Sequence, residues 1–213
     1  MNILVIAAHP DDEILGVGGT ICKHVANGDD VYVCIVTKAY DPEWSKEYIA
    51  EKIKEQDKVD KLLNIKKRYN LDLPTVKLNT ISHGEFNKRI TDIVDNVKPD
   101  IVYTHFEHDL NYDHTLIFRA SMVATRPPKK IKLLCYETLS ETEWNNKAFQ
   151  HNLWVDITNF IDKKIKAFKV YESEVKKYPH PRSEEGIRTL SKKRGNEICI
   201  EYAEAFMIIR NFL

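Results

Sequence analysis

Short apolar runs that alternate with amphipathic helical segments are the feature that most constrains the fold of this 213-residue chain. Residues 2–8 (NILVIAA) and 30–37 (DVYVCIVT) are continuous apolar runs, which are typical of parallel strands buried on both faces. Residues 101–105 and 131–137 repeat the pattern, and helical segments separate the runs. The sequence therefore predicts an α/β fold, with a mostly parallel sheet that carries helices on both faces.

Helical periodicity and capping residues give approximate bounds for the remaining elements. Helices are expected at residues 16–27, 43–63, 83–96, 113–125 and 158–175, and from a cap at Ser183 onward. Thr158 is the expected N-cap of the helix that follows it. Further strands are expected at residues 75–78, 152–156 and 202–209. No repeat or shift in composition marks a boundary, so residues 1–213 are expected to form a single domain.

The balance of charges limits the classes of partner. Acidic and basic residues number 32 each, so no attraction to nucleic acid or to an anionic membrane is expected. No apolar stretch reaches the ~18 residues of a membrane span, and residues 1–8 lack the basic start of a signal peptide. The four cysteines form no C-x-x-C pair, which favours a reducing, cytoplasmic location. The sequence leaves open whether the chain forms a homo-oligomer.

Two segments rich in metal-binding side chains directly follow predicted strands. His9-Pro10-Asp11-Asp12-Glu13 follows the first strand, and residues 105–114 follow the strand at 101–105. In open α/β sheets, ligands bind just past the carboxyl ends of the strands. A catalytic zinc ion takes three protein ligands and leaves a position free, and His9, Asp12 and His114 would form such a set. Asp11 would then stand beside the metal, where it could take a proton from water.

Structural roles are the alternative at each of these positions. Asp11 and Asp12 alone could be first-turn carboxylates favoured by the helix dipole, and Asp113 could cap its helix. Two such clusters at neighbouring strand ends favour a site instead. The stretch Gly16-Val17-Gly18-Gly19 does not match G-x-G-x-x-G, so it indicates close packing of a helix on the sheet and not cofactor binding.

The first of these clusters, followed by Gly16, Gly18, Gly19 and Thr20, resembles the opening signature of the GlcNAc-phosphatidylinositol de-N-acetylase-like family, also called PIG-L or LmbE-like. A second similar motif consists of Thr104-His105, Asp109-Leu110-Asn111 and Asp113-His114. Later matches include Pro179-His180-Pro181-Arg182-Ser183 and Ala203-Glu204-Ala205-Phe206, so the resemblance covers nearly the whole chain. It implies a Rossmann-like fold, one zinc ion per chain and hydrolysis of an N-acyl amide on a sugar.

The resemblance also implies roles for individual residues. It gives the metal to His9, Asp12 and His114 and the role of general base to Asp11. Beyond what the resemblance implies, Asp113 is expected to orient an active-site donor. The expected partner is a small N-acetyl sugar or sugar conjugate. Two alternatives stay open: hydrolysis of a different amide, such as a thiol-sugar conjugate or an antibiotic intermediate, and a metal-binding or sugar-binding module without turnover.

A stiff segment far along the chain, Tyr178-Pro179-His180-Pro181-Arg182, completes the set of candidates. Asn111 stands where other branches of the family have a histidine, so the site needs another donor, while Asn111 itself is expected to contact the substrate. We expect the segment to fold over the mouth of the site. His180 would then supply the catalytic donor, and Arg182 would bind sugar hydroxyls or a phosphate. The alternative is a surface loop whose histidine caps the next helix.

Overall fold

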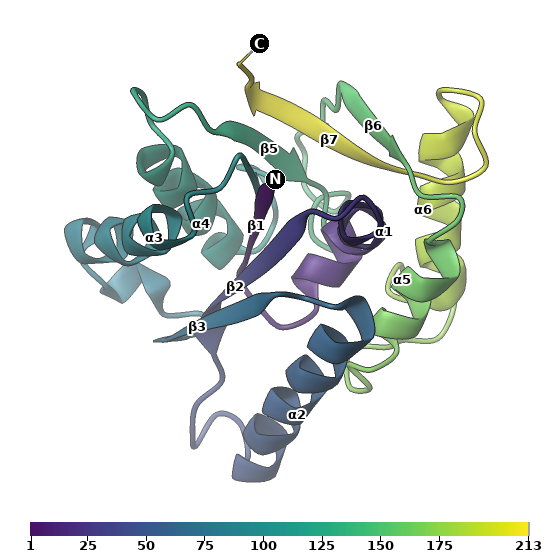
Figure 1. Ribbon diagram of the computed structural model, residues 1–213. Coiled ribbons are helices and arrows are strands. Elements are labelled where there is room, and N and C mark those ends of the chain that lie inside the picture. Colours follow the sequence, from purple (N-terminus) through teal and green to yellow (C-terminus); the bar gives the residue numbers. More distant parts are fainter. Residues whose placement is uncertain (213) are drawn as a thin grey trace.

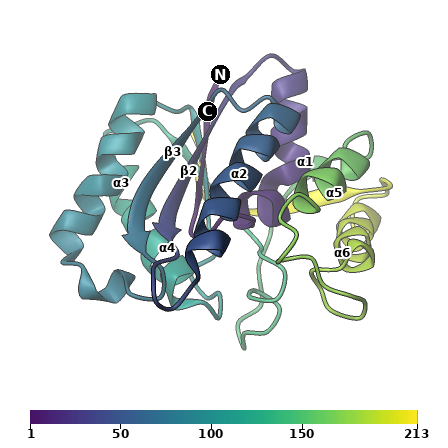
Figure 2. The ribbon, with the colours of Figure 1, turned by 90° about the horizontal axis from the view of Figure 1, so that it is seen from below.

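The computed structural model describes residues 1–212 and contains one sheet with helices on both of its faces (Figures 1 and 2). The strands are β1 (Asn2–Ala7), β2 (Asp30–Lys38), β3 (Lys67–Pro74), β4 (Ile101–Thr104), β5 (Lys132–Tyr136), β6 (Leu153–Asp156) and β7 (Ala203–Arg210). The helices are α1 (Asp12–Ala26), α2 (Lys46–Leu63), α3 (His83–Val97), α4 (Tyr112–Ala124), α5 (Ile161–Phe168) and α6 (Glu184–Asn196), with a 3₁₀ turn at Leu78–Thr80.

The order of the strands indicates where a ligand would bind. The sheet runs β3-β2-β1-β4-β5-β7-β6, and β7 runs antiparallel to both of its neighbours, β5 and β6, whereas the other described pairs are parallel. This confirms the predicted α/β class with a mostly parallel sheet. The chain passes from β1 outward to β2 and β3 and then returns to place β4 on the other side of β1. Such a reversal opens a crevice at the carboxyl ends of β1 and β4, where ligands bind in sheets of this kind.

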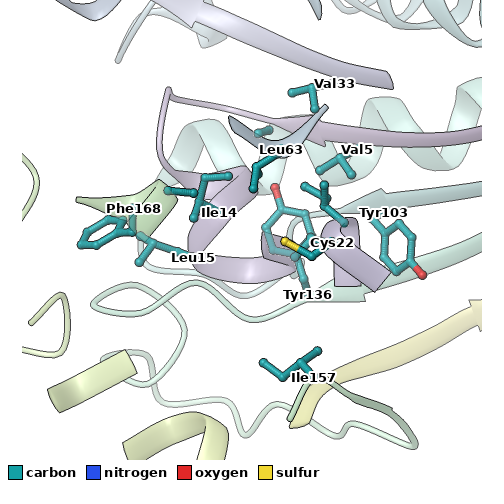
Figure 3. Packing of buried hydrophobic residues seen from close by; sticks show 14 of the residues in the cluster. Val5, Ile14, Leu15, Cys22, Val33, Leu63, Tyr103, Tyr136, Ile157 and Phe168 are labelled. Atoms are coloured by element: carbon teal, nitrogen blue, oxygen red, sulfur yellow. The ribbon is translucent and has the colours of Figure 1, made fainter. Parts of the chain in front are cut away.

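The central strand β1 is buried on both faces, as its continuous apolar run predicts. Ile3 and Val5 point to the cluster built with α1, α2 and α5, whereas Leu4 and Ile6 point to the cluster built with α3 and α4. This alternation follows from the two-residue period of a strand. Figure 3 shows the first cluster around Val5, and Figure 2 shows the two helical layers on opposite sides of the sheet.

The glycines of the first motif allow α1 to pack closely, as expected. A Cβ atom at Gly16 would lie 2.1 Å from the ring of Tyr136, and one at Gly19 would lie 2.7 Å from Ile157. The space beside Gly16 lets Tyr136 pass under α1, where its hydroxyl donates to the carbonyl of Ile6 at 2.9 Å. Each glycine therefore marks a contact between α1 and a neighbouring element.

The third strand lies elsewhere than the sequence predicts. Instead of residues 75–78, β3 comprises Lys67–Pro74, and Leu78 begins the 3₁₀ turn. As an edge strand, β3 is largely exposed or half-buried, so it carries no continuous apolar run. Because the edge strand is not buried on both faces, its sequence lacks the continuous apolar run that identifies the buried strands.

The starts of α1 and α5 differ from the prediction, whereas α3 begins at His83 and α6 follows the Ser183 cap as expected. The helix expected at 158–175 is reduced to α5, whose N-cap is Phe160. Thr158 does not cap it, and its hydroxyl oxygen instead accepts the amide of Tyr202 at 3.3 Å. Helix α1 begins at Asp12 and not at Gly16, so the first metal-binding segment reaches into its first turn. Ser183 caps α6 as expected, accepting the amide of Gly186 at 2.9 Å.

Within residues 1–212, no helix is both long and apolar enough to cross a membrane. Cys22, Cys34 and Cys135 are buried as free thiols. Burial raises the pKa of the Cys34 thiol to about 12, so this thiol is protonated at neutral pH and serves as a core residue.

A buried ion pair joins α1, α5 and β7. The ammonium of Lys164 donates to Glu204 at 2.6 Å and to the carbonyl of Leu15 at 2.8 Å. The Glu204 carboxylate accepts the amides of Gly19 and Thr20 at 2.8 and 2.7 Å. Leu15 and Gly19 would bond to one another in a regular helix, so the ion pair supplies partners for both within α1.

We expect Lys164→Met to lower the free energy of unfolding by about 3–5 kcal/mol, because it leaves the Glu204 carboxylate buried without a counterion. Urea denaturation measures the change. The control is Lys66→Met, which removes an exposed pair with Asp30 and should cost about 0–1 kcal/mol. Equal losses in the two variants would contradict the structural role of the buried pair.

Candidate active site

The two segments rich in possible metal ligands, residues 9–13 and 105–114, meet at the crevice between β1 and β4. His9, Asp12 and His114 each offer a ligand atom, and these atoms all lie within 4.8 Å of one another. The Oδ2 atom of Asp12 lies 3.2 Å from Nδ1 of His9 and 3.3 Å from Nε2 of His114. The structure thus brings together the three residues that the sequence suggests as metal ligands.

The chemistry of this cluster fits a cation. The Oδ1 atom of Asp12 is buried and has no hydrogen-bond partner among the described residues, a costly state for a carboxylate oxygen. Asp109 accepts a hydrogen bond from Nδ1 of His114 at 2.9 Å, which fixes the ring with Nε2 facing Asp12. A carboxylate behind a histidine in this way is common at zinc sites. Two imidazoles and a carboxylate also match the ligands of catalytic zinc.

His105 packs against His114 of this cluster, and the sequence suggests no role for it. Its ring stacks on His114 with centroids 3.7 Å apart, and its Nε2 atom accepts the amide of Ala8 at 2.8 Å. Burial and the neighbouring His114 lower the pKa of His105 to about 4. His105, Asp109 and His114 form a second group of possible ligands, with Nδ1 of His105 3.7 Å from Oδ2 of Asp109. Both oxygens of Asp109 are already bound, however, by Nδ1 of His114 at 2.9 Å and by the hydroxyl of Thr142 at 2.5 Å. We therefore assign His105 to fixing the His114 ring.

Asp11 lies beside the cluster with its side chain buried. Burial and the Asp12 carboxylate raise the pKa of Asp11 well above its usual range, although Arg182 lowers it. A carboxylate with a raised pKa is better able to take a proton near neutral pH. For Asp12, burial also raises the pKa, but His114 and His105 outweigh it and hold the pKa well below its usual range. The two neighbouring carboxylates are therefore suited to different tasks, proton transfer and metal binding.

A cavity of about 390 Å³ opens from this cluster toward α2. Its metal-proximal end is lined by His9, Asp11, Asn111, Glu141 and Arg182. Its other end is lined by α2 and its neighbours, including Trp44, Tyr48, Lys52, Gln56 and Asn70. A volume of this size suits a small organic ligand, and aromatic walls with a few polar groups are typical of such sites.

Asn111 and Asp113 hold the start of α4 against the site. The Oδ1 atom of Asn111 accepts the amide of Asp113 at 3.0 Å, so Asn111 is the N-cap and Asp113 is not. Asp113 accepts the amide of Val76 at 2.7 Å, and its Oδ2 atom lies 3.4 Å from Nε2 of His9. This arrangement suits Asp113 to orienting His9, while Asn111 borders the cavity.

The stiff segment before α6 brings Arg182 to the cavity but not His180. Arg182 donates to Asp11 at 3.0 Å and to the hydroxyl of Ser140 at 2.8 Å. The Nδ1 atom of His180 accepts the backbone amide of Arg182 at 3.0 Å, and its ring packs edge-on against Trp144. His180 is absent from the residues that line the cavity. No described contact therefore connects His180 with the metal cluster.

Comparison with known proteins decides the family. A model of the PIG-L family, described as GlcNAc-PI de-N-acetylase, matches residues 4–125. The chain belongs to this family. It is 30% identical to the uncharacterized deacetylase YaiS of Escherichia coli over 147 residues, covering 65% of this chain and 75% of that protein. It is 24% identical to the diacetylchitobiose deacetylase of Thermococcus kodakarensis, covering 98% and 83% of the two chains.

A solved PIG-L-like structure agrees with the fold. The N,N'-diacetylchitobiose deacetylase of Pyrococcus horikoshii superposes with a TM-score of 0.80 at 25% identity, over 98% of this chain and 83% of that one. The α/β fold with its mostly parallel sheet is therefore shared with a deacetylase of known structure.

For this PIG-L protein we expect Arg182→Ala to raise KM about tenfold or more, because a hydrogen bond from a charged group contributes about 1.5–3 kcal/mol. It should also lower kcat, because it removes the hydrogen bond to Asp11 at 3.0 Å. Initial rates over a range of substrate concentrations measure the change. Arg188→Ala is the matched control, since Arg188 lies on α6 and pairs with Asp162 and Glu184. An unchanged KM for Arg182→Ala would show that Arg182 does not contact the substrate.

The same assay tests His180. A lower kcat for His180→Ala with unchanged zinc content would support the donor role that the sequence suggests. An unchanged kcat would reject it and leave His180 as a residue that supports the Arg182 backbone.

Proposed function

We propose that the chain hydrolyses the N-acetyl amide of an N-acetylated amino sugar, giving acetate and a free amine, with one zinc ion per chain. The observation that carries this proposal is the buried Asp12 oxygen without a partner beside His9 and His114, with Asp11 adjoining. The family description and the diacetylchitobiose deacetylase relative support the class of substrate.

In this proposal, His9, Asp12 and His114 hold the metal. A bound zinc ion would polarise the acetyl carbonyl and lower the pKa of water at the site. Asp11 accepts a proton from the attacking water while the water oxygen forms a bond to the acetyl carbon. The carbon–nitrogen bond then breaks, and Asp11 delivers the proton to the sugar nitrogen. One oxygen atom of the acetate therefore comes from water.

The remaining residues at the metal-proximal end of the cavity would bind the sugar or orient the side chains of Asp11 and His9. Arg182 holds one oxygen of Asp11 at 3.0 Å, which limits the orientations of the carboxylate. Asp113 orients His9, and Asn111 and Arg182 border the space for the sugar. A module that only binds sugar or metal would have no use for a buried carboxylate with a raised pKa beside the metal ligands.

Acetate release from a panel of substrates tests this function. The panel contains free N-acetylglucosamine, its 1-O-linked conjugates, diacetylchitobiose and an N-acetylated amino acid as the non-sugar control. We expect acetate from one or more of the sugars and none from the amino acid. Zinc binding without acetate from any sugar would contradict the proposal and favour a binding module.

A further inference from the structure

The backbone of Asp11 adopts a conformation that a residue with a side chain rarely takes. Its φ is 135° and its ψ is −31°, directly before the first residue of α1. Such a conformation costs about 1–3 kcal/mol and persists only where the surroundings hold it. Because Asp11 is the proposed base, the contacts that hold its backbone also set the position of its carboxylate.

Glu13 makes the contact that holds this peptide. Its side chain is fully buried, and Oε2 accepts the amide of Asp11 at 2.9 Å. The other oxygen, Oε1, accepts the hydroxyl of Tyr171 at 2.6 Å and Nη1 of Arg68 at 3.1 Å. Both oxygens of Glu13 are thus engaged, and the carboxylate is fixed from two sides.

Arg68 connects Glu13 to a second helix. It lies on β3 with a side chain only 6% exposed, and its guanidinium also binds Asp60 on α2. Nε and Nη2 of Arg68 donate to Oδ1 of Asp60 at 2.9 and 2.6 Å. A buried chain of charges therefore runs from α2 through β3 to the Asp11 peptide. The carboxylates of Asp60 and Glu13 bind different edges of one planar group, which favours a single orientation.

We propose that Glu13 and Arg68 are positioning residues, which hold the Asp11 backbone so that its carboxylate faces the metal cluster. This inference rests on the proposed role of Asp11 as base. It gives a function to Glu13, the last residue of the first motif, and to Arg68, which lies on the edge strand. Neither residue lines the cavity, so both act through Asp11 and not on the substrate.

We expect loss of this buried chain of charges to affect the rate more than substrate binding. Without Arg68, the Glu13 carboxylate is buried with Tyr171 as its remaining side-chain partner. Glu13 can then move, and the Asp11 peptide is free to leave its unfavourable φ. Displacement of a reacting group by about 1 Å lowers rates roughly 100-fold. Asn111 and Arg182, which border the proposed space for the sugar, make no hydrogen bond or ion pair with Arg68 among the described contacts, so substrate binding should be preserved.

Three variants of the full chain test the proposal: Arg68→Met, Arg68→Lys and Tyr171→Phe. We expect Arg68→Met to lower kcat roughly 10- to 100-fold with KM and zinc content unchanged. Arg68→Lys retains the charge and should recover part of the rate. Tyr171→Phe removes one hydrogen bond and should lower kcat by a smaller factor. If Arg68→Met does not fold, Arg68→Lys and Tyr171→Phe test the proposal in its place. An unchanged kcat in both of these variants would overturn the proposal.

The matched control is Arg194→Met, which removes a similarly buried arginine bound to Glu137 through two nitrogens at 2.7 and 2.6 Å. Its kcat should stay close to that of the wild type. An equal fall in kcat for Arg194→Met would show a general effect of lost stability and would overturn the positioning role.

A crystal structure of the Arg68→Met protein gives a readout that does not depend on turnover. We expect the φ of Asp11 to leave the positive region or its carboxylate to shift, whereas an unchanged Asp11 would overturn the proposal. If the wild type releases no acetate, the proposed function fails. The conformation of Asp11 in the variant still decides whether Arg68 positions it.

Discussion

Replacement of Asp11 by asparagine is expected to lower kcat by about 10²- to 10⁴-fold while zinc remains bound. The amide is nearly isosteric with the carboxylate but cannot accept the proton from water, and a general base typically contributes a factor of this size. Metal content should stay near one ion per chain, because His9, Asp12 and His114 are unchanged. Acetate release and elemental analysis on the same preparation measure both quantities.

Glu107→Gln is the control for Asp11→Asn. Glu107 lies in the second metal-binding segment, but its side chain is 40% exposed and contacts only His108 among the ion pairs described. Its kcat should remain close to that of the wild type. A near-normal rate for Asp11→Asn with zinc bound would show that another group takes the proton.

Replacement of His114 by alanine is expected to remove both metal and activity. The change deletes a proposed ligand and also leaves Asp109 without the imidazole that it orients at 2.9 Å. Loss of a group that merely supports a ligand costs about 10- to 100-fold in metal affinity, so loss of the ligand itself should cost more. Zinc affinity measured by competition with a chromophoric chelator gives the result.

His108→Ala is the matched control for His114→Ala. His108 lies six positions earlier in the same segment, and its side chain is 46% exposed. This variant should keep both zinc and kcat. Retention of wild-type zinc affinity by His114→Ala would exclude His114 as a ligand and remove the basis of the proposed site.

The sequence predicts the centre of the fold and the metal cluster for the same physical reason. Strand β1 is buried on both faces, so it appears as an apolar run, and its end marks where His9 and Asp12 lie. The strand at 101–105 has the same pattern and locates His114. Because β1 and β4 are neighbours, the two segments meet.

Apart from the bond between Glu13 and the Asp11 amide, which spans two positions, the contacts that hold Asp11 and Glu13 were not predictable, because they join residues that are far apart in the chain. Arg182 binds Asp11 across 171 positions, and Tyr171 binds Glu13 across 158. Arg68 lies on the edge strand β3, which the sequence pattern wrongly predicted at residues 75–78. No local periodicity reports such pairs, since they depend on how α1, β3 and the segment before α6 pack together.

The most direct test of the zinc deacetylase proposal is a titration of metal-depleted protein with zinc, with the rate of acetate release measured at each step on a substrate identified from the panel. The rate should be near zero after chelation and should rise linearly until one zinc ion is bound per chain. A rate that is the same in the depleted and the reconstituted protein would contradict the proposal.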